Sequence, residues 1–110
     1  MTIANPTERA AFIQGLRDLA DFLQEHPEVP VTPYGNAITF FPHAASEADE
    51  RAEIDRIAAA LDVKPTGTSD GDFYRAIRKF GPITYKAISI SAAWKAAHDA
   101  RHSYAAVVQP

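Results

Sequence analysis

The chain has 110 residues, 46% of them hydrophobic, which is the usual size of one domain and enough apolar material for a core. It contains no cysteine, which excludes disulfides, thiolate metal sites and a cysteine nucleophile. The net charge is −3 at pH 7, and no apolar run reaches the roughly 20 residues of a membrane span. We therefore expect a single cytoplasmic domain over residues 1–110, with no signal peptide and no membrane partner.

The first expected element is an amphipathic helix. Asn5-Pro6-Thr7-Glu8 is typical of a helix start, since Asn caps well, Pro suits the first position and Glu8 completes a capping box. His26 precedes Pro27, a position that disfavours helical backbone, so the helix should end there. Apolar residues recur at +4, +7 and +11 and predict one buried face. They are Phe12, Leu16, Leu19 and Leu23, widened by Ile13 and Ala20.

The next segment predicts a connector, a strand and a second helix. Prolines 27, 30 and 33 are spaced by one turn of polyproline II, which indicates a stiff connector or, alternatively, a ligand for an aromatic groove. Residues 37–41 are β-branched and aromatic, and they predict a strand. Ser46 begins a helix with acids in its first turn, and Glu47 can pair with Arg51. Ile54, Ile57 and Leu61 mark its buried face.

The second half of the chain predicts a loop, a hairpin and a short helix. Residues 64–72 indicate a loop, and 73–80 fit a strand or a helix. We prefer a strand, because Gly81-Pro82 and the convincing strand 83–90 follow. Gly-Pro is not the Asn-Gly type of tight turn, so we expect a hairpin loop of three to five residues. Ser91 should cap a short helix, and 104–110 should form a tail.

The element order α-β-α-β-β-α predicts an α+β fold, a small antiparallel or mixed sheet with helices packed on one face. Residues spaced by two share one side of a strand. We therefore expect the apolar faces of both helices to cover the sheet side that carries Ile38, Phe40, Ile88 and Ile90.

The predicted hairpin carries the first candidate site. Residues 63–110 contain 7 Lys or Arg and 3 Asp or Glu, against 4 and 11 in residues 1–62. Basic residues among aromatic rings can hold nucleic acid, and the candidate set is Arg75, Arg78, Lys79, Lys86 and Tyr85. The alternative is the solvated face of an ordinary sheet, or pairing of the basic half with the acidic half.

Two further motifs suggest metal binding. His98 and His102 stand four residues apart on one helix face, a spacing that suits zinc, but no third ligand follows. The alternative is two solvated histidines. Asp70-Gly71-Asp72 resembles part of a calcium loop but lacks the later acids, so a turn is expected. No nucleophile elbow, phosphate loop or acid–base pair is present, and we expect neither a cofactor nor enzymatic activity.

Several short stretches resemble a group of small uncharacterised proteins from high-GC Gram-positive bacteria and their phages. These stretches are residues 19–23, 26–30, 54–58, 80–85, 103–104 and 108–110. The resemblance implies a phage or mobile-element accessory protein and brings no ligand or catalytic residue. The missing catalytic motifs, together with the surfaces that the Pro-rich connector, the hairpin and the charge split offer, favour a non-enzymatic interaction module that binds another protein or itself as a homodimer. The alternative is a nucleic-acid-binding accessory protein that uses the hairpin 73–90.

Overall fold

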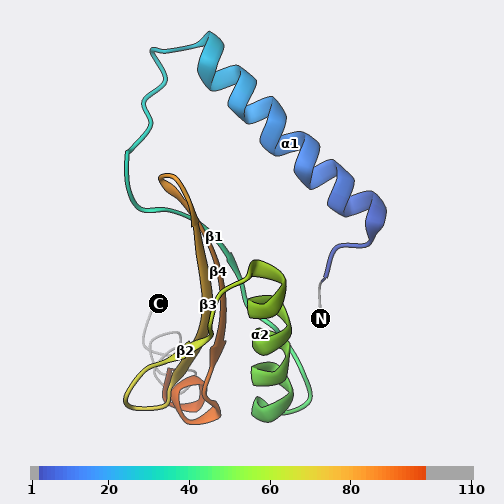
Figure 1. Ribbon diagram of the computed structural model, residues 1–110, viewed down its shortest axis with the longest axis vertical. Helices are drawn as coiled ribbons and strands as arrows, with labels where there is room; N and C mark the ends of the chain where they lie inside the picture. Colours follow the sequence, from blue (N-terminus) through green and yellow to red (C-terminus); the bar gives the residue numbers. More distant parts are fainter. Residues whose placement is uncertain (1–2, 99–110) are drawn as a thin grey trace, which may run out of the picture. The chain divides into compact units, whose positions relative to one another are not determined.

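The computed structural model describes residues 3–98 (Figure 1), so His102 and the expected tail 104–110 lie outside the described residues. The chain divides into two units, Met1–Pro33 and Tyr34–Pro110, and each is described by itself. Among the described residues, no helix is long and apolar enough to cross a membrane.

The first unit contains α1 (Pro6–Glu25), and its ends are those expected from the sequence. The backbone N–H of Glu8 donates to the Asn5 side chain at 2.8 Å, and the Glu8 carboxylate accepts from the backbone N–H of Asn5 at 2.9 Å. This reciprocal capping box satisfies two donors that the first turn leaves free. The helix ends before His26, whose amide still bonds the carbonyl of Phe22.

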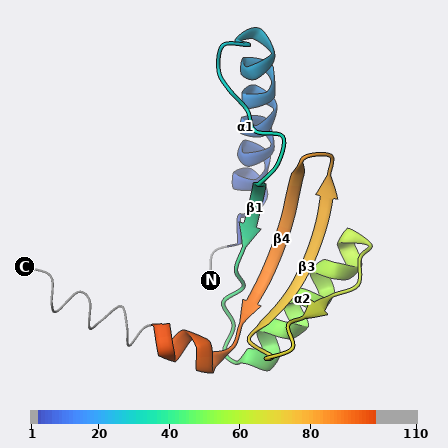
Figure 2. The same cartoon turned by 90° about the vertical axis from the view of Figure 1, so that its left-hand side faces the viewer.

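The second unit is built on a four-stranded mixed sheet, which confirms the α+β class (Figure 2). Its strands are β1 (Asn36–Phe40), β2 (Thr66–Gly67), β3 (Phe73–Phe80) and β4 (Ile83–Ile90), in the spatial order β1-β4-β3-β2. β1 runs parallel to β4, whereas β3 is antiparallel to both β4 and β2. Residues 73–80 are thus a strand, as preferred, and the short β2 lies within the segment expected to be only a loop.

The β3–β4 hairpin turns more tightly than expected. Phe80 pairs with Ile83, so the loop is the two residues Gly81 and Pro82 and the expectation of three to five was wrong. Gly81 has φ +61°. A type II′ turn needs a positive φ at its first central position, and the fixed φ of proline suits the second, so Gly-Pro closes a two-residue hairpin.

One helix, α2 (Glu47–Leu61), packs on one face of this sheet (Figures 1 and 2). Ser46 caps it as expected, since its hydroxyl accepts from the Asp49 amide at 3.1 Å. The fully buried core consists of Ile54, Ala58, Ala76 and Ala87. Half-buried side chains around it include Phe40, Ile57, Leu61 and Tyr74. A further helix begins at Ala92, after Ser91, and continues at least to His98.

The structure corrects the expected core in β4 and leaves the α1 face uncovered within the first unit. None of the residues of α1 is buried, and Phe12 and Leu19 are each 54% exposed. In β4 the buried residues are Ala87 and Ser89, so Ile88 and Ile90 point to the opposite face of the sheet. In β1 the expectation for Phe40 holds, because this ring packs against the core.

The corrected core predicts which substitutions unfold the chain. Ile54→Ala should lower the free energy of unfolding by about 2–5 kcal/mol, because it leaves a cavity beneath α2. Leu19→Ala should change it by less than about 0.5 kcal/mol, as an exposed position does. Chemical denaturation at dilute protein concentration compares the two variants. Equal midpoints for both would show that the core is assigned wrongly.

Candidate interaction surfaces

One candidate surface is an apolar stripe on the first helix. We define the α1 face as Phe12, Ile13, Leu16, Leu19 and Phe22, together with the half-buried Leu23. The five larger exposures lie between 39% and 54%. The Phe22 ring packs against His26, with centroids 4.3 Å apart, and the polar side carries a hydrogen bond from Gln14 to Asp18 of 2.8 Å. The face is therefore apolar, continuous along the helix and open to a partner.

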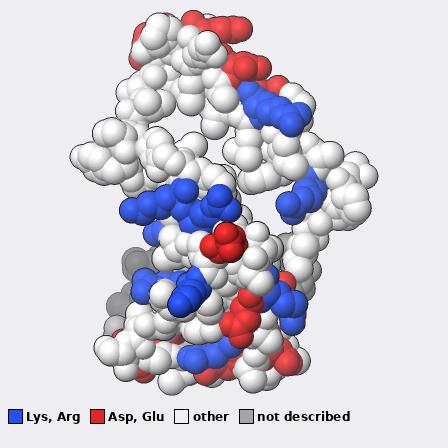
Figure 3. Space-filling model, in the orientation of Figure 1, with Lys and Arg blue, Asp and Glu red and all other residues white. Residues whose placement is uncertain are grey.

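The second candidate surface is the side of the sheet turned away from α2. Alternation along β3 and β4 places Arg75, Ile77 and Lys79 on this side, with Lys86 and Ile88 beside them. We call these five residues the open sheet face. Lys86 pairs across the strands with Ile77, and Arg75 pairs with Ile88, so each of these cations neighbours an aliphatic side chain. Lys and Arg gather around the hairpin in the surface view (Figure 3).

The structure separates the predicted nucleic-acid residues into two groups. Arg75, Lys79 and Lys86 lie on the open sheet face, whereas Arg78 and Tyr85 point to the α2 side. The Arg78 guanidinium donates to the Leu61 carbonyl at 3.1 Å, and the Tyr85 ring packs against the core. The sequence already contained the signal that separates them, since neighbouring residues of a strand face opposite ways.

The hairpin cations are not neutralised by the acidic helix. Residues 73–90 contain four Lys or Arg and no acid, while α2 holds five acids and two Arg. Ion pairs among the described residues join Glu50 to Lys95, Glu47 to Arg51, and other pairs outside the hairpin. Within the described residues, Lys95 pairs the basic half of the chain with α2, whereas no ion pair involves a hairpin cation. The Nε of Arg75 is buried and has no hydrogen-bond partner among the described residues.

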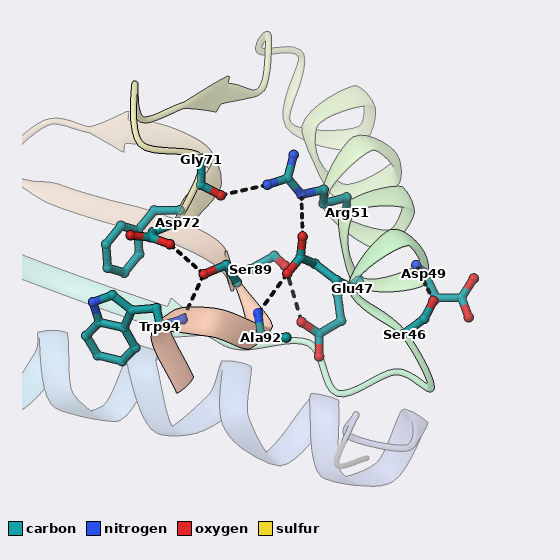
Figure 4. Close-up of polar contacts among 12 residues, drawn as sticks. Ser46, Glu47, Asp49, Arg51, Gly71, Asp72, Ser89, Ala92 and Trp94 are labelled. Atoms are coloured by element: carbon teal, nitrogen blue, oxygen red, sulfur yellow. Dashed lines mark hydrogen bonds and ion pairs between the residues drawn. The ribbon is translucent and has the colours of Figure 1, made fainter. Parts of the chain in front are cut away.

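A polar cluster joins α2 to the helix that begins at Ala92 (Figure 4). Glu50 is only 5% exposed, and its carboxylate accepts hydrogen bonds from Ser89 at 3.2 Å and from Lys95 at 3.0 and 3.1 Å. The Ala92 amide donates to Glu47 at 2.7 Å. These partners satisfy one another, which is how a buried charge is normally tolerated. The cluster therefore has a structural explanation, although sequence reasoning missed it.

A second polar group lies at the turn before β3. The Ser91 hydroxyl donates to Asp72 at 2.6 Å and accepts from the Trp94 amide at 3.0 Å, which is the expected helix cap (Figure 4). The Thr68 hydroxyl and the Asp72 amide both bond the Asp70 carboxylate and lower the pKa of Asp70. The Asp-Gly-Asp segment is therefore organised as a turn by its own hydrogen bonds.

Within the described part of the chain, the structure does not place His98 in a group of side chains that could hold a metal ion. His98 stacks on Trp94 with ring centroids 3.4 Å apart, and its Nδ1 lies 3.1 Å from the Trp94 carbonyl. Between residues 3 and 98 there is no group of three or more His, Cys, Asp or Glu that could hold a metal ion. Its expected companion, His102, lies outside that range.

Comparison with known proteins returned no match: no family model, curated protein or solved structure is similar enough to assign the chain. The function is therefore inferred from the two surfaces described above.

The contact between β3 and α2 has a consequence that a titration of the tyrosines can test. The Tyr74 hydroxyl donates to the Asp55 carboxylate, which raises the pKa of Tyr74 above the usual value near 10. Because the folded pKa is the higher one, this contribution to stability is complete below about pH 10 and is lost as pH rises further. In an absorbance titration of tyrosinate, Tyr74→Phe should remove the component that titrates at the highest pH.

The matched control is Asp55→Asn, which keeps the Tyr74 hydroxyl and removes the neighbouring charge. Its Tyr74 should titrate at lower pH than in the wild type. An unchanged titration in Asp55→Asn would show that the carboxylate does not control this pKa.

Proposed function

We propose that the chain is a non-enzymatic interaction module that binds another protein through the α1 face. The observation that carries the proposal is the exposure of five large apolar side chains along one side of a single helix. A contiguous exposed apolar patch on a protein of this size is typical of a binding site. The capping box shows that the helix has a defined start, so its apolar residues keep a fixed spacing.

The energetics of an isolated helix support the same proposal. Burying a Leu, Ile or Phe side chain contributes about 1.5–3 kcal/mol, so even part of the α1 face can drive association. A 20-residue helix with few stabilising contacts is marginal in water, and most helices gain their stability from packing an apolar face. Binding would therefore stabilise both the complex and the helix. The expected mode is a helix that lies in an apolar groove or against another helix.

The polar side chains support a non-enzymatic role. Glu50, Lys95 and Ser89 are engaged with one another at the junction of α2 and the following helix. A group that is to act as an acid, a base or a nucleophile must reach a substrate. The phage or mobile-element association stays a prediction from the sequence resemblance, and the neighbouring genes would test it.

Site-specific photo-crosslinking in the native host tests the proposal. A photoreactive amino acid at position 19 of the α1 face should give an adduct with a defined protein, and one at position 18, on the polar side, should not. The protein found in the adduct, whether a foreign protein or the chain itself, should bind the purified wild-type chain. It should not bind the purified Leu16→Asp variant. No protein adduct at position 19, or equal adducts at both positions, would overturn the proposal.

A second candidate function is nucleic-acid binding by the open sheet face. The favouring observation is that Arg75, Lys79 and Lys86 share one side of the sheet and form no ion pair within the described residues. Three cations on one surface can contact successive phosphates.

Adjacent residues of β3 provide the test. Lys79→Glu should weaken binding to single-stranded or duplex DNA and reduce the salt slope by about 1, because one phosphate contact is lost. Arg78→Glu is the matched control, since it makes the same change on the opposite side of the strand and should have a much smaller effect. Fluorescence anisotropy at several salt concentrations measures both. An absence of wild-type binding at low salt would eliminate this candidate.

A further inference from the structure

We propose that the partner of the α1 face is a second copy of the chain, with the two α1 helices packed antiparallel. The inference rests on the proposed function, because it requires that α1 binds protein, and it names that protein. Three independent features of α1 fit a second α1 better than they fit an unspecified groove. They are the spacing of the apolar residues, the sizes of the residues beside them and the distribution of charge.

The spacing of the α1 face matches a helix–helix seam. Phe12, Leu16, Leu19 and Leu23 are separated by four, three and four residues, which is the heptad spacing that lets two helices interlock over two heptads. Antiparallel pairing about the midpoint between positions 17 and 18 places Phe12 opposite Leu23 of the second copy. The same symmetry places Leu16 opposite Leu19. Every residue of the seam therefore meets an apolar residue.

The residues beside the seam are complementary in size in this orientation. Gly15 and Phe22 flank one side of the seam, and antiparallel packing brings the Phe22 ring of one copy near Gly15 of the other. Apart from its two chain neighbours and the nearby backbone of the helix, nothing lies within 4 Å of where a Cβ on Gly15 would stand, so there is room for a ring. On the other side, Ile13 lies near Ala20 of the second copy. Parallel packing would give neither of these large-against-small pairs.

The distribution of charge along α1 favours pairing with an antiparallel second copy. Residues 6–17 carry Arg9 and Arg17 against Glu8, and residues 18–25 carry three acids and no base. Antiparallel packing sets the net +1 half against the net −3 half at both ends. The like-charged halves are then separated by up to the length of a 20-residue helix, roughly 30 Å, which exceeds the Debye length of about 8 Å at physiological salt. Parallel packing would set the two −3 halves against each other.

The helix dipole makes the same distinction. The C-terminal end of a helix carries partial negative charge and favours basic residues, yet the last turn of α1 has none and contains Glu25. An antiparallel second copy brings its positive N-terminal end and its Arg9 to this position. The arrangement that is unfavourable in one α1 is thus compensated in a pair.

Analytical ultracentrifugation of the full chain tests self-association. The interface of two short helices is below the standard size of about 1,200 Å², so we expect a monomer–dimer equilibrium over roughly 5–500 μM. Leu16→Asp should remain monomeric over this range. Gln14→Asp is the matched control, since it adds the same residue on the polar side and should dimerise at least one-third as tightly as the wild type. Helicity measured by circular dichroism should rise with wild-type concentration and stay constant in Leu16→Asp.

Cysteine pairing tests the orientation, because the natural chain has no cysteine. Phe12→Cys and Leu23→Cys chains, mixed under mild oxidation, should form the mixed disulfide in preference to either symmetric one. Positions 12 and 23 of one helix are about 16 Å apart along its axis, so antiparallel packing keeps identical cysteines apart. Symmetric disulfides as the main product would overturn the antiparallel arrangement.

The results separate this inference from the proposed function. A wild type that stays monomeric throughout the concentration range overturns self-association. If position 19 also forms an adduct with a foreign protein in the host, the proposed function stands and only the choice of partner is wrong. If position 19 gives no protein adduct at all, both fall.

Discussion

The close approach of α2 to the β3–β4 hairpin is the contact on which the second unit depends. Ala76 and Ala87 are directly paired across the two strands, and both are fully buried. Two small side chains at the centre of the sheet leave room for Ile54 of the helix, which is the largest fully buried side chain of the described residues. Replacing either alanine by a larger residue would force the helix away from the sheet.

Polar contacts extend this small core along the helix. Among residues 3–98, four side chains supply the fully buried apolar core, which is a small number for a segment of this length. On either side of Ile54, Glu50 bonds Ser89 and Asp55 bonds Tyr74, so α2 is tied to both strands of the hairpin. These bonds fix the rotation of the helix, since turning it would leave a buried carboxylate without partners.

Local signals in the sequence predicted the helix ends well. The Asn5 and Ser46 caps, the Ser91 cap and the hairpin itself depend on residues close together in the chain, so short patterns are sufficient to identify them. The length of the Gly81-Pro82 loop was predicted wrongly because only the Asn-Gly sequence was taken as typical of a two-residue hairpin loop. A turn with glycine at its first central position is equally suitable.

Long-range packing explains why the sheet faces were assigned wrongly. Hydrophobicity favours Ile88 and Ile90 as core residues over Ala87 and Ser89. The helix lies so close that alanine fits better than isoleucine. Ser89 is buried because Glu50, 39 positions earlier in the sequence, accepts a hydrogen bond from its hydroxyl. Neither the helix distance nor this partner can be read from β4 alone.

The sequence predicted which residues form the candidate surfaces but not where these residues lie in the fold. The α1 stripe was recognised from its period, and the expectation that it belongs to the core assumed that every apolar face is covered within one chain. The hairpin cations were recognised as a group, and only the period of the strand divides Arg78 from Lys79. A period identifies which residues share a face, whereas the structure is needed to show what that face contacts.

The two surfaces differ in the force that would drive binding, because the fold sorts charge and apolar residues differently in each unit. Residues 1–33 carry 2 Lys or Arg and 5 acids, which accounts for the whole net charge of −3, and their binding face is apolar. Salt screens the attraction between oppositely charged halves of the two α1 helices as well as the net repulsion between the units, and it leaves apolar burial intact, so it should weaken the α1 pair only slightly. The open sheet face depends on Arg75, Lys79 and Lys86, and screening acts directly against any contact these cations make with phosphates. The dependence of binding on salt therefore identifies which surface a partner occupies, even before its position on the chain is mapped.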